Sequence, residues 1–106
     1  MKMLVLLASL LLTAQAGYAD DIFTAIEKGD LKKVSALQKN REALHARDRM
    51  GRTPLLLASY YKNSGILDSL IRAGADLKDQ DARGINALMY AVGGENLAAM
   101  NALRRA

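Results

Sequence analysis

The sequence predicts an all-α protein, a solenoid of helix-turn-helix units with short extended hairpin arms. The first observation is a spacing of 33 residues, and the pairs related by it are Asp48 and Asp81, Gly51 and Gly84, Ala58 and Ala91, and Leu70 and Leu103. The second is an apolar stripe at helical spacing within the period, which Ile66, Leu67, Leu70 and Ile71 show most clearly. Helical units that recur at a fixed period stack on one another, because none can bury its apolar face alone.

The first 19 residues are predicted to be a secretory signal peptide. Lys2 provides a basic start, residues 3–12 form an apolar run, and small residues follow at Ala14, Ala16, Gly17 and Ala19. The run is too short to cross a bilayer, which takes about 20 apolar residues. Cleavage is expected after Ala19, with Ala16 as the alternative, and the protein is expected to be periplasmic or secreted.

The composition limits the chemistry of the exported part. The chain has 15 Lys and Arg against 11 Asp and Glu, so loss of Lys2 with the leader leaves a net charge near +3. There is no cysteine, which excludes a disulfide, a thiolate nucleophile and a lipid-modified cysteine at the cleavage site. The remaining residues 20–106 suffice for one small domain.

The first unit is predicted over residues 20–47. One helix is expected at residues 21–28 and a second at residues 31–39, with Gly29 and Asp30 in the turn between them. The residues expected to face inward are Ile22, Ala25, Ile26, Leu31, Val34 and Leu37. Lys32, Lys33, Ser35 and Lys39 are expected to face solvent, which suits a unit whose outer side meets water.

The second unit, residues 48–80, is the most regular. Thr53 can cap the first helix, and Pro54 then occupies the first helical position, where its missing N–H is not needed. The second helix carries the apolar stripe, and Gly74 is expected to close it in a left-handed conformation. The segment from Tyr60 to Ser64 is expected to join the two helices.

The third unit, residues 81–106, keeps the spacing but changes the chemistry. Asn86 can still cap the first helix, whereas Gly93 and Gly94 are expected to weaken its end. The last helix is predominantly apolar over residues 97–103 and has little polar cover. Two alternatives follow: this end packs against another chain, or the chain is shorter than its relatives.

Gly-x-Thr-Pro-Leu at residues 51–55 and Ala-Gly-Ala-Asp at residues 73–76, with the period of 33, resemble the ankyrin repeat. The resemblance covers residues 20–106 and extends to the small exported ankyrin-repeat proteins of bacteria. Leu56 departs from it by replacing the family's usual histidine. The resemblance implies three repeats, at residues 20–47, 48–80 and 81–106, and a module that binds other proteins.

The sequence gives no sign of an enzyme. The single histidine, His45, falls in an extended arm and has neither a second histidine nor a cysteine as a partner for a catalytic base or a metal. The glycines are explained by turns and do not form a phosphate-binding loop. No catalytic residue, metal site or cofactor is predicted, and nucleic-acid binding and a stable membrane anchor are not expected.

The resemblance does imply a recognition surface, a concave face made of the arms and the first helices. The residues it assigns to partner binding are Arg47, Arg49, Met50, Arg52, Tyr60, Tyr61, Gln80, Arg83 and Ile85. Arginine and tyrosine are enriched at energetically important interface positions, and the arginines suit a partner protein with an acidic surface. The alternative is an ordinary solvated loop beside two half-buried tyrosines.

Two functions are compatible with this surface, and a third, a minor enzyme or ligand carrier, is disfavoured by the missing catalytic constellation. The first is a protein-binding module that acts as an accessory or protective factor for a periplasmic enzyme. The second is an immunity or inhibitor protein that neutralises a toxin or hydrolase by direct binding. The fate of the captured enzyme's activity would separate the two.

Overall fold

The computed structural model describes residues 21–106, so the predicted leader and Asp20 lie outside the described residues. A helical segment over residues 21–28 opens the described part. It is followed by α2 (Leu31–Leu37), α3 (Arg41–Leu44), α4 (Pro54–Tyr60), α5 (Ser64–Arg72), α6 (Ala87–Gly93) and α7 (Leu97–Arg105). The only bridge between extended segments in this part is the isolated antiparallel pair of Gln80 and Asn86. The predicted all-α class is therefore confirmed.

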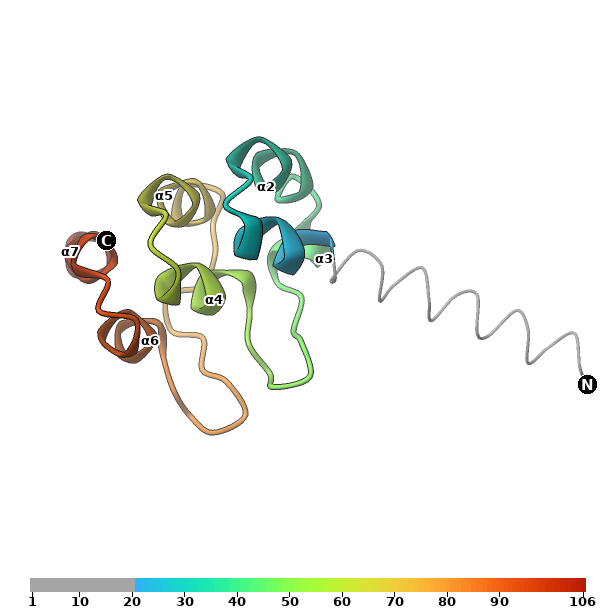
Figure 1. Cartoon of the computed structure of the whole chain (residues 1–106). Coiled ribbons are helices and arrows are strands. Elements are labelled where there is room, and N and C mark those ends of the chain that lie inside the picture. Colours follow the sequence, from blue (N-terminus) through green and yellow to red (C-terminus); the bar gives the residue numbers. More distant parts are fainter. Residues whose placement is uncertain (1–20) are drawn as a thin grey trace, which may run out of the picture.

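The helices lie in two rows. Figure 1 shows α2, α5 and α7 in one row and the segment 21–28, α4 and α6 in the other, with two long loops extending from the second row. Each unit contributes one helix to each row, and the second unit lies between the other two. We call the two loops the arms, at residues 45–53 and 73–86. This is the stack of helix-turn-helix units that the spacing of 33 predicts.

Side-chain caps begin the helices at the predicted period. Three caps lie 33 residues apart, at Asp30, Asn63 and Asn96. Each side chain accepts the backbone N–H of the residue three positions later, at 3.2, 3.3 and 3.1 Å. Thr53 and Asn86 cap α4 and α6 in the same way, and Pro54 occupies the start of α4 as predicted. Each cap satisfies an N–H group that the helix leaves free.

The helix ends use a left-handed residue. Gly74, with φ of +100°, follows α5, and the N–H groups of Gly74 and Ala75 bond to the carbonyls of Ile71 and Leu70. This pattern of two bonds closes a helix. At the end of α6 the left-handed residue is Glu95, with φ of +52°, and not either of the glycines before it.

Gly94 has a different role from the one predicted. A Cβ atom at Gly94 would overlap the backbone carbonyl oxygen of Tyr60, whereas a Cβ at Gly93 would meet nothing within 4 Å. Gly94 is therefore the residue that lets α6 approach the end of α4. The expectation that both glycines weaken the helix end did not include this contact, in which the missing side chain of Gly94 allows close packing.

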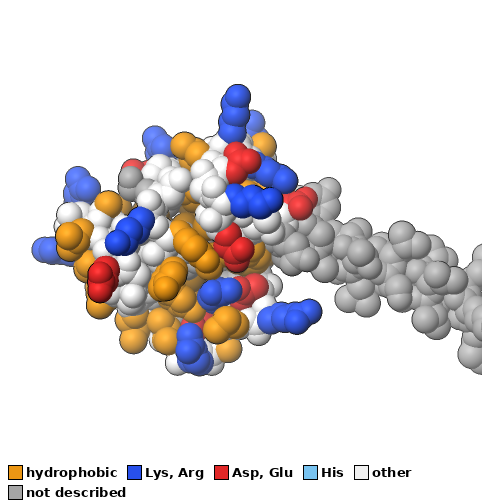
Figure 2. Space-filling view, in the orientation of Figure 1, with side chains coloured by type: hydrophobic (Ala, Val, Ile, Leu, Met, Phe, Trp, Pro, Cys, Tyr) orange, Lys and Arg blue, Asp and Glu red, His pale blue; other side chains and the backbone are white. Residues whose placement is uncertain are grey.

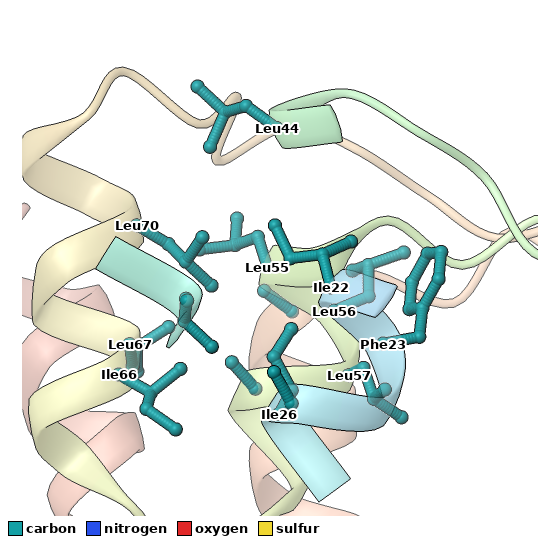
Figure 3. Packing of buried hydrophobic residues seen from close by; sticks show 14 of the residues in the cluster. Ile22, Phe23, Ile26, Leu44, Leu55, Leu56, Leu57, Ile66, Leu67 and Leu70 are labelled. Atoms are coloured by element: carbon teal, nitrogen blue, oxygen red, sulfur yellow. The ribbon is translucent and has the colours of Figure 1, made fainter. Parts of the chain in front are cut away.

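The core runs through all three units and centres on α4. Residues 54–59 of α4 are all buried, and Figure 3 shows Leu55, Leu56 and Leu57 between side chains of the segment 21–28 and those of α5. The stripe predicted for the second helix is confirmed, since Ile66, Leu67 and Leu70 have no exposed surface. The apolar run of α4 thus joins its neighbours on both sides.

Two details of the first unit differ from prediction. Leu31 was expected to face inward, but it is 41% exposed because it lies at the start of α2, beside Gly65 of the next unit. The second helix ends at Leu37 and not at residue 39, because Asn40 caps the short helix α3 by accepting the N–H of Glu42. The predicted burial of Ile22, Ala25, Ile26 and Val34 is confirmed.

Candidate protein-binding surface

Each arm is built around one aspartate. One carboxylate oxygen of Asp48 accepts the N–H groups of Met50 and Arg52, both at 2.9 Å. In the second arm Asp81 accepts those of Arg83 and Ile85, at 2.8 and 3.0 Å. Because these bonds turn the chain tightly, each arm also needs a left-handed residue, and the glycine three residues after each aspartate supplies it.

The two arms are joined to each other. The N–H of Ala82 bonds to the carbonyl of Met50 at 3.1 Å. The Arg47 guanidinium donates to the carbonyls of Gly51 and Gln80, at 2.6 and 2.7 Å. These bonds fix the relative position of the arms, so the tips form one surface.

Three arginines of the predicted set are paired with aspartates of the arms. The pairs are Arg47 with Asp79 at 3.5 Å, Arg52 with Asp48 at 2.7 Å, and Arg83 with Asp81 at 3.3 Å. In each pair the arginine side chain is more exposed than the aspartate, most of all for Arg83, which is 60% exposed above a fully buried carboxylate. The arms thus present guanidinium groups outward and hold the carboxylates beneath them.

Hydrogen bonds keep both organising carboxylates charged. The Tyr90 hydroxyl, which donates to Asp81 at 2.5 Å, has the largest effect in holding the pKa of Asp81 well below its usual range. Burial acts to raise the pKa of Asp48, but hydrogen bonds from Arg52 and Met50 outweigh it and keep that pKa low. Burial in turn raises the pKa of Tyr90, and the bond to Asp81 adds to the effect. Both arms therefore rest on ionised aspartates at neutral pH.

The remaining predicted residues divide into exposed and packed groups. Arg49 and Met50 are exposed at the tip of the first arm, and Tyr60 is exposed at the end of α4. Tyr61 is half-buried against the core, and its ring lies edge-on to that of Tyr60 with centroids 5.4 Å apart. Ile85 is half-buried and Gln80 is exposed. No described hydrogen bond joins either tyrosine hydroxyl to the arms.

Sequence reasoning missed two residues of this surface. Tyr90 was not assigned a role, although it reaches nine residues back to Asp81. Asp79 was also missed, although it pairs with Arg47. The 33-residue period could have indicated Tyr90. The matching residue of the second unit is Leu57, which is buried, so a tyrosine at this position places a hydroxyl group where the repeat packs.

Within residues 21–106 the structure contains no group of three metal-ligating side chains. His45 is the C-cap residue that follows α3, and its side chain is exposed. None of the helices described has the length and apolar character that crossing a membrane requires.

Comparison with known proteins identifies the family of the helical repeats. The sequence model of the family "Ankyrin repeats (3 copies)" matches residues 22–105. The chain belongs to the ankyrin-repeat family. It is also 35% identical over 66 residues to YahD of Escherichia coli (strain K12), which is named as an ankyrin repeat protein. The match covers 62% of this chain and spans about a third of the length of that relative.

Ankyrin repeats serve in general as modules for protein–protein binding. The burial of Leu56 explains why this chain differs from the usual ankyrin pattern at that position. Leu56 is completely buried, so at this position apolar packing between repeats stands where the family usually has a histidine.

Proposed function

We propose that this ankyrin-repeat protein is an exported binding module that holds an acidic protein against its arms and the end of α4. We propose further that the partner is a periplasmic enzyme for which the module is an accessory or protective factor. The basic, apolar and small-residue pattern of residues 1–19 supports export.

The observation that carries this proposal is the arrangement of the ion pairs in the arms. Each guanidinium lies outside its aspartate and is held by it, as Arg83 is by Asp81. An arginine whose position is already restricted loses less side-chain freedom when a partner binds. Because the planar guanidinium matches a carboxylate, the exposed edges of these groups suit Asp and Glu side chains of another protein.

Exposed apolar side chains beside the arginines supply the anchors. Met50 lies at the tip of the first arm, next to the exposed Arg49, and Tyr60 lies at the end of α4. Interfaces combine such aromatic or flexible apolar groups with arginine, and a few of them carry most of the binding free energy. Tyr61 belongs to the packing of the fold and is a support for Tyr60.

The test is capture of a partner from the exported protein fraction of the source organism. We expect Arg49→Glu and Tyr60→Ala each to abolish or strongly reduce capture, because each removes an exposed side chain of the surface. Arg72→Glu is the matched control, since Arg72 is an exposed arginine at the end of α5, in the other row of helices. Equal capture by all the variants, with unchanged circular dichroism, would contradict the proposed surface.

The captured protein also distinguishes the proposed role from toxin neutralisation. A resident enzyme that stays active when bound supports the accessory role. A toxin or hydrolase that loses its activity on binding would instead assign the module to immunity or inhibition.

A further inference from the structure

The outer side of the third repeat presents an apolar surface. We call this surface the end face, and its members with their exposed fractions are Leu88 (43%), Met89 (53%), Val92 (58%) and Leu97 (72%). They are four of the seven large hydrophobic residues exposed in the described part of the chain. Figure 1 shows α6 and α7 at one end of the stack, and Figure 2 shows hydrophobic side chains together with charged ones over that end. Large exposed apolar patches on a protein mark interaction sites.

The repeat register identifies what the end face is shaped to contact. The residues 33 positions earlier than Leu88, Met89 and Val92 are Leu55, Leu56 and Ser59 of α4, and all three are fully buried. The residue 66 positions before Leu97 is Leu31, which lies beside Gly65 of the following repeat. All four positions thus belong to the side of a repeat that packs against a neighbour.

Opposite charges flank the end face. Arg104, near the end of α7, lines a groove with Leu88, Leu77 and Leu103. Glu95, in the turn between α6 and α7, lines another groove with Leu97 and with Lys62 of the second repeat. The residues 33 positions before Arg104 and Glu95 are Ile71 and Lys62 of the second repeat. Both line grooves shared with the third repeat, so the register places Arg104 and Glu95 where a repeat meets the next one. A positive group therefore lies near the start of α6 and a negative group lies just beyond its end.

We infer that the end face binds a second copy of this chain, in a dimer with twofold symmetry. A twofold axis through the middle of the face exchanges its two ends. It brings the apolar residues of α6 together and sets Arg104 of each copy near Glu95 of the other. The face is thus self-complementary in both apolar character and charge, and the proposal is independent of partner binding at the arms.

Head-to-tail stacking of copies is excluded by the opposite side of the molecule. The positions of the first repeat that correspond to Ala87, Tyr90, Gly94 and Ala99 are Asp21, Thr24, Lys28 and Lys33. All four of these first-repeat residues are exposed and polar. An apolar end face that packed against them would bury charges without partners.

Sedimentation velocity of the purified protein, from low micromolar to millimolar concentration, tests this inference. We expect a reversible monomer–dimer equilibrium. Val92→Asp should raise the dimer Kd about tenfold or more, because the twofold axis places the new charge in the interface twice. Met50→Asp is the matched control, since Met50 is exposed to a similar extent on an arm, and it should leave the Kd unchanged. A monomer at all concentrations, or equal weakening by both variants, would overturn the inference.

A charge exchange tests the twofold arrangement itself. Arg104→Glu and Glu95→Arg should each raise the dimer Kd severalfold, because each places like charges opposite one another. The double variant should restore the Kd of the unmodified protein, since both pairs then attract in reversed order. Failure of restoration, with thermal unfolding unchanged, would overturn the pairing of Arg104 with Glu95 and therefore the proposed symmetry.

Discussion

The hydroxyl of Tyr90 lies 2.5 Å from the buried carboxylate of Asp81, and this bond ties α6 to the arm that precedes it. The same carboxylate also accepts two backbone N–H groups of the arm and pairs with Arg83. The order of the second arm, and of the guanidinium that it presents, therefore depends on one ionised aspartate.

This relationship predicts a pH-dependent effect of Tyr90→Phe. The pKa of Asp81 is lower in the folded protein than in the unfolded chain, so the aspartate stabilises the fold above about pH 4. That stabilisation is lost as the pH falls toward the lowered value. Tyr90→Phe should reduce the unfolding free energy at pH 7, and the difference from the unmodified protein should shrink in acid. Urea unfolding of both proteins at pH 7 and in acid measures the difference in unfolding free energy. A difference that does not change with pH would refute the role given to the bond.

The adjacent glycines at the end of α6 should respond in opposite directions. Gly94→Ala should destabilise the fold by about 1–3 kcal/mol, because the new Cβ would overlap the carbonyl of Tyr60. Gly93→Ala should stabilise it by about 0.5–1 kcal/mol, since this helical position is open and alanine favours the helix. Thermal unfolding of the two variants is the measurement. Equal effects would mean that α6 does not approach α4 in this way.

The helix caps at Asn96 and Asn63 occupy equivalent positions but differ in their bonds. Asn96 is buried, and its amide also donates to the carbonyls of Ser59 and Tyr61, at 3.1 and 2.9 Å. Asn96→Ala should cost about 2–4 kcal/mol, because it removes a cap and leaves these carbonyls without that donor. Asn63→Ala should cost only about 1 kcal/mol, because its one bond to the preceding repeat is more exposed. Chemical unfolding of both variants should show this ranking.

Leu70 and Leu103 provide the same comparison for the core. Leu70 is fully buried, so Leu70→Ala should cost about 2–5 kcal/mol, enough to unfold much of a stack this small. Leu103 occupies the matching position of the third repeat but is only partly buried. Leu103→Ala should therefore cost clearly less. Unchanged melting of the Leu70 variant would contradict its assignment to the core.

Much of the fold was predictable because the residues that begin and end its helices act through local contacts. The caps at Thr53 and Asn86, the proline at the start of α4 and the closing glycine at Gly74 act within a few residues of themselves. The period then places each unit against the next. The predicted end of the second helix of the first unit, at residue 39, is wrong because Asn40 caps the short helix α3, so that α2 ends at Leu37.

The candidate binding surface was less predictable because it depends on contacts between repeats. The resemblance assigned Arg47 to the surface by its position in an arm, yet its guanidinium bonds to carbonyls of both arms, including that of Gln80, 33 residues away. The role of Gly94 likewise appears only when the end of α4 lies beside it. Composition and spacing show that a residue is basic or small, but not which backbone atom of another repeat lies next to it.

The complete burial of residues 54–59 in α4 also governs how the chain folds. Each repeat packs mainly on its sequence neighbour, so the folding of such a stack follows nearest-neighbour coupling and requires few contacts between distant parts of the chain. The second repeat has a neighbour on both sides, and structure that forms there can extend in either direction. Amide hydrogens of α4 should consequently exchange with solvent most slowly, and those of α7 and the first repeat should open first.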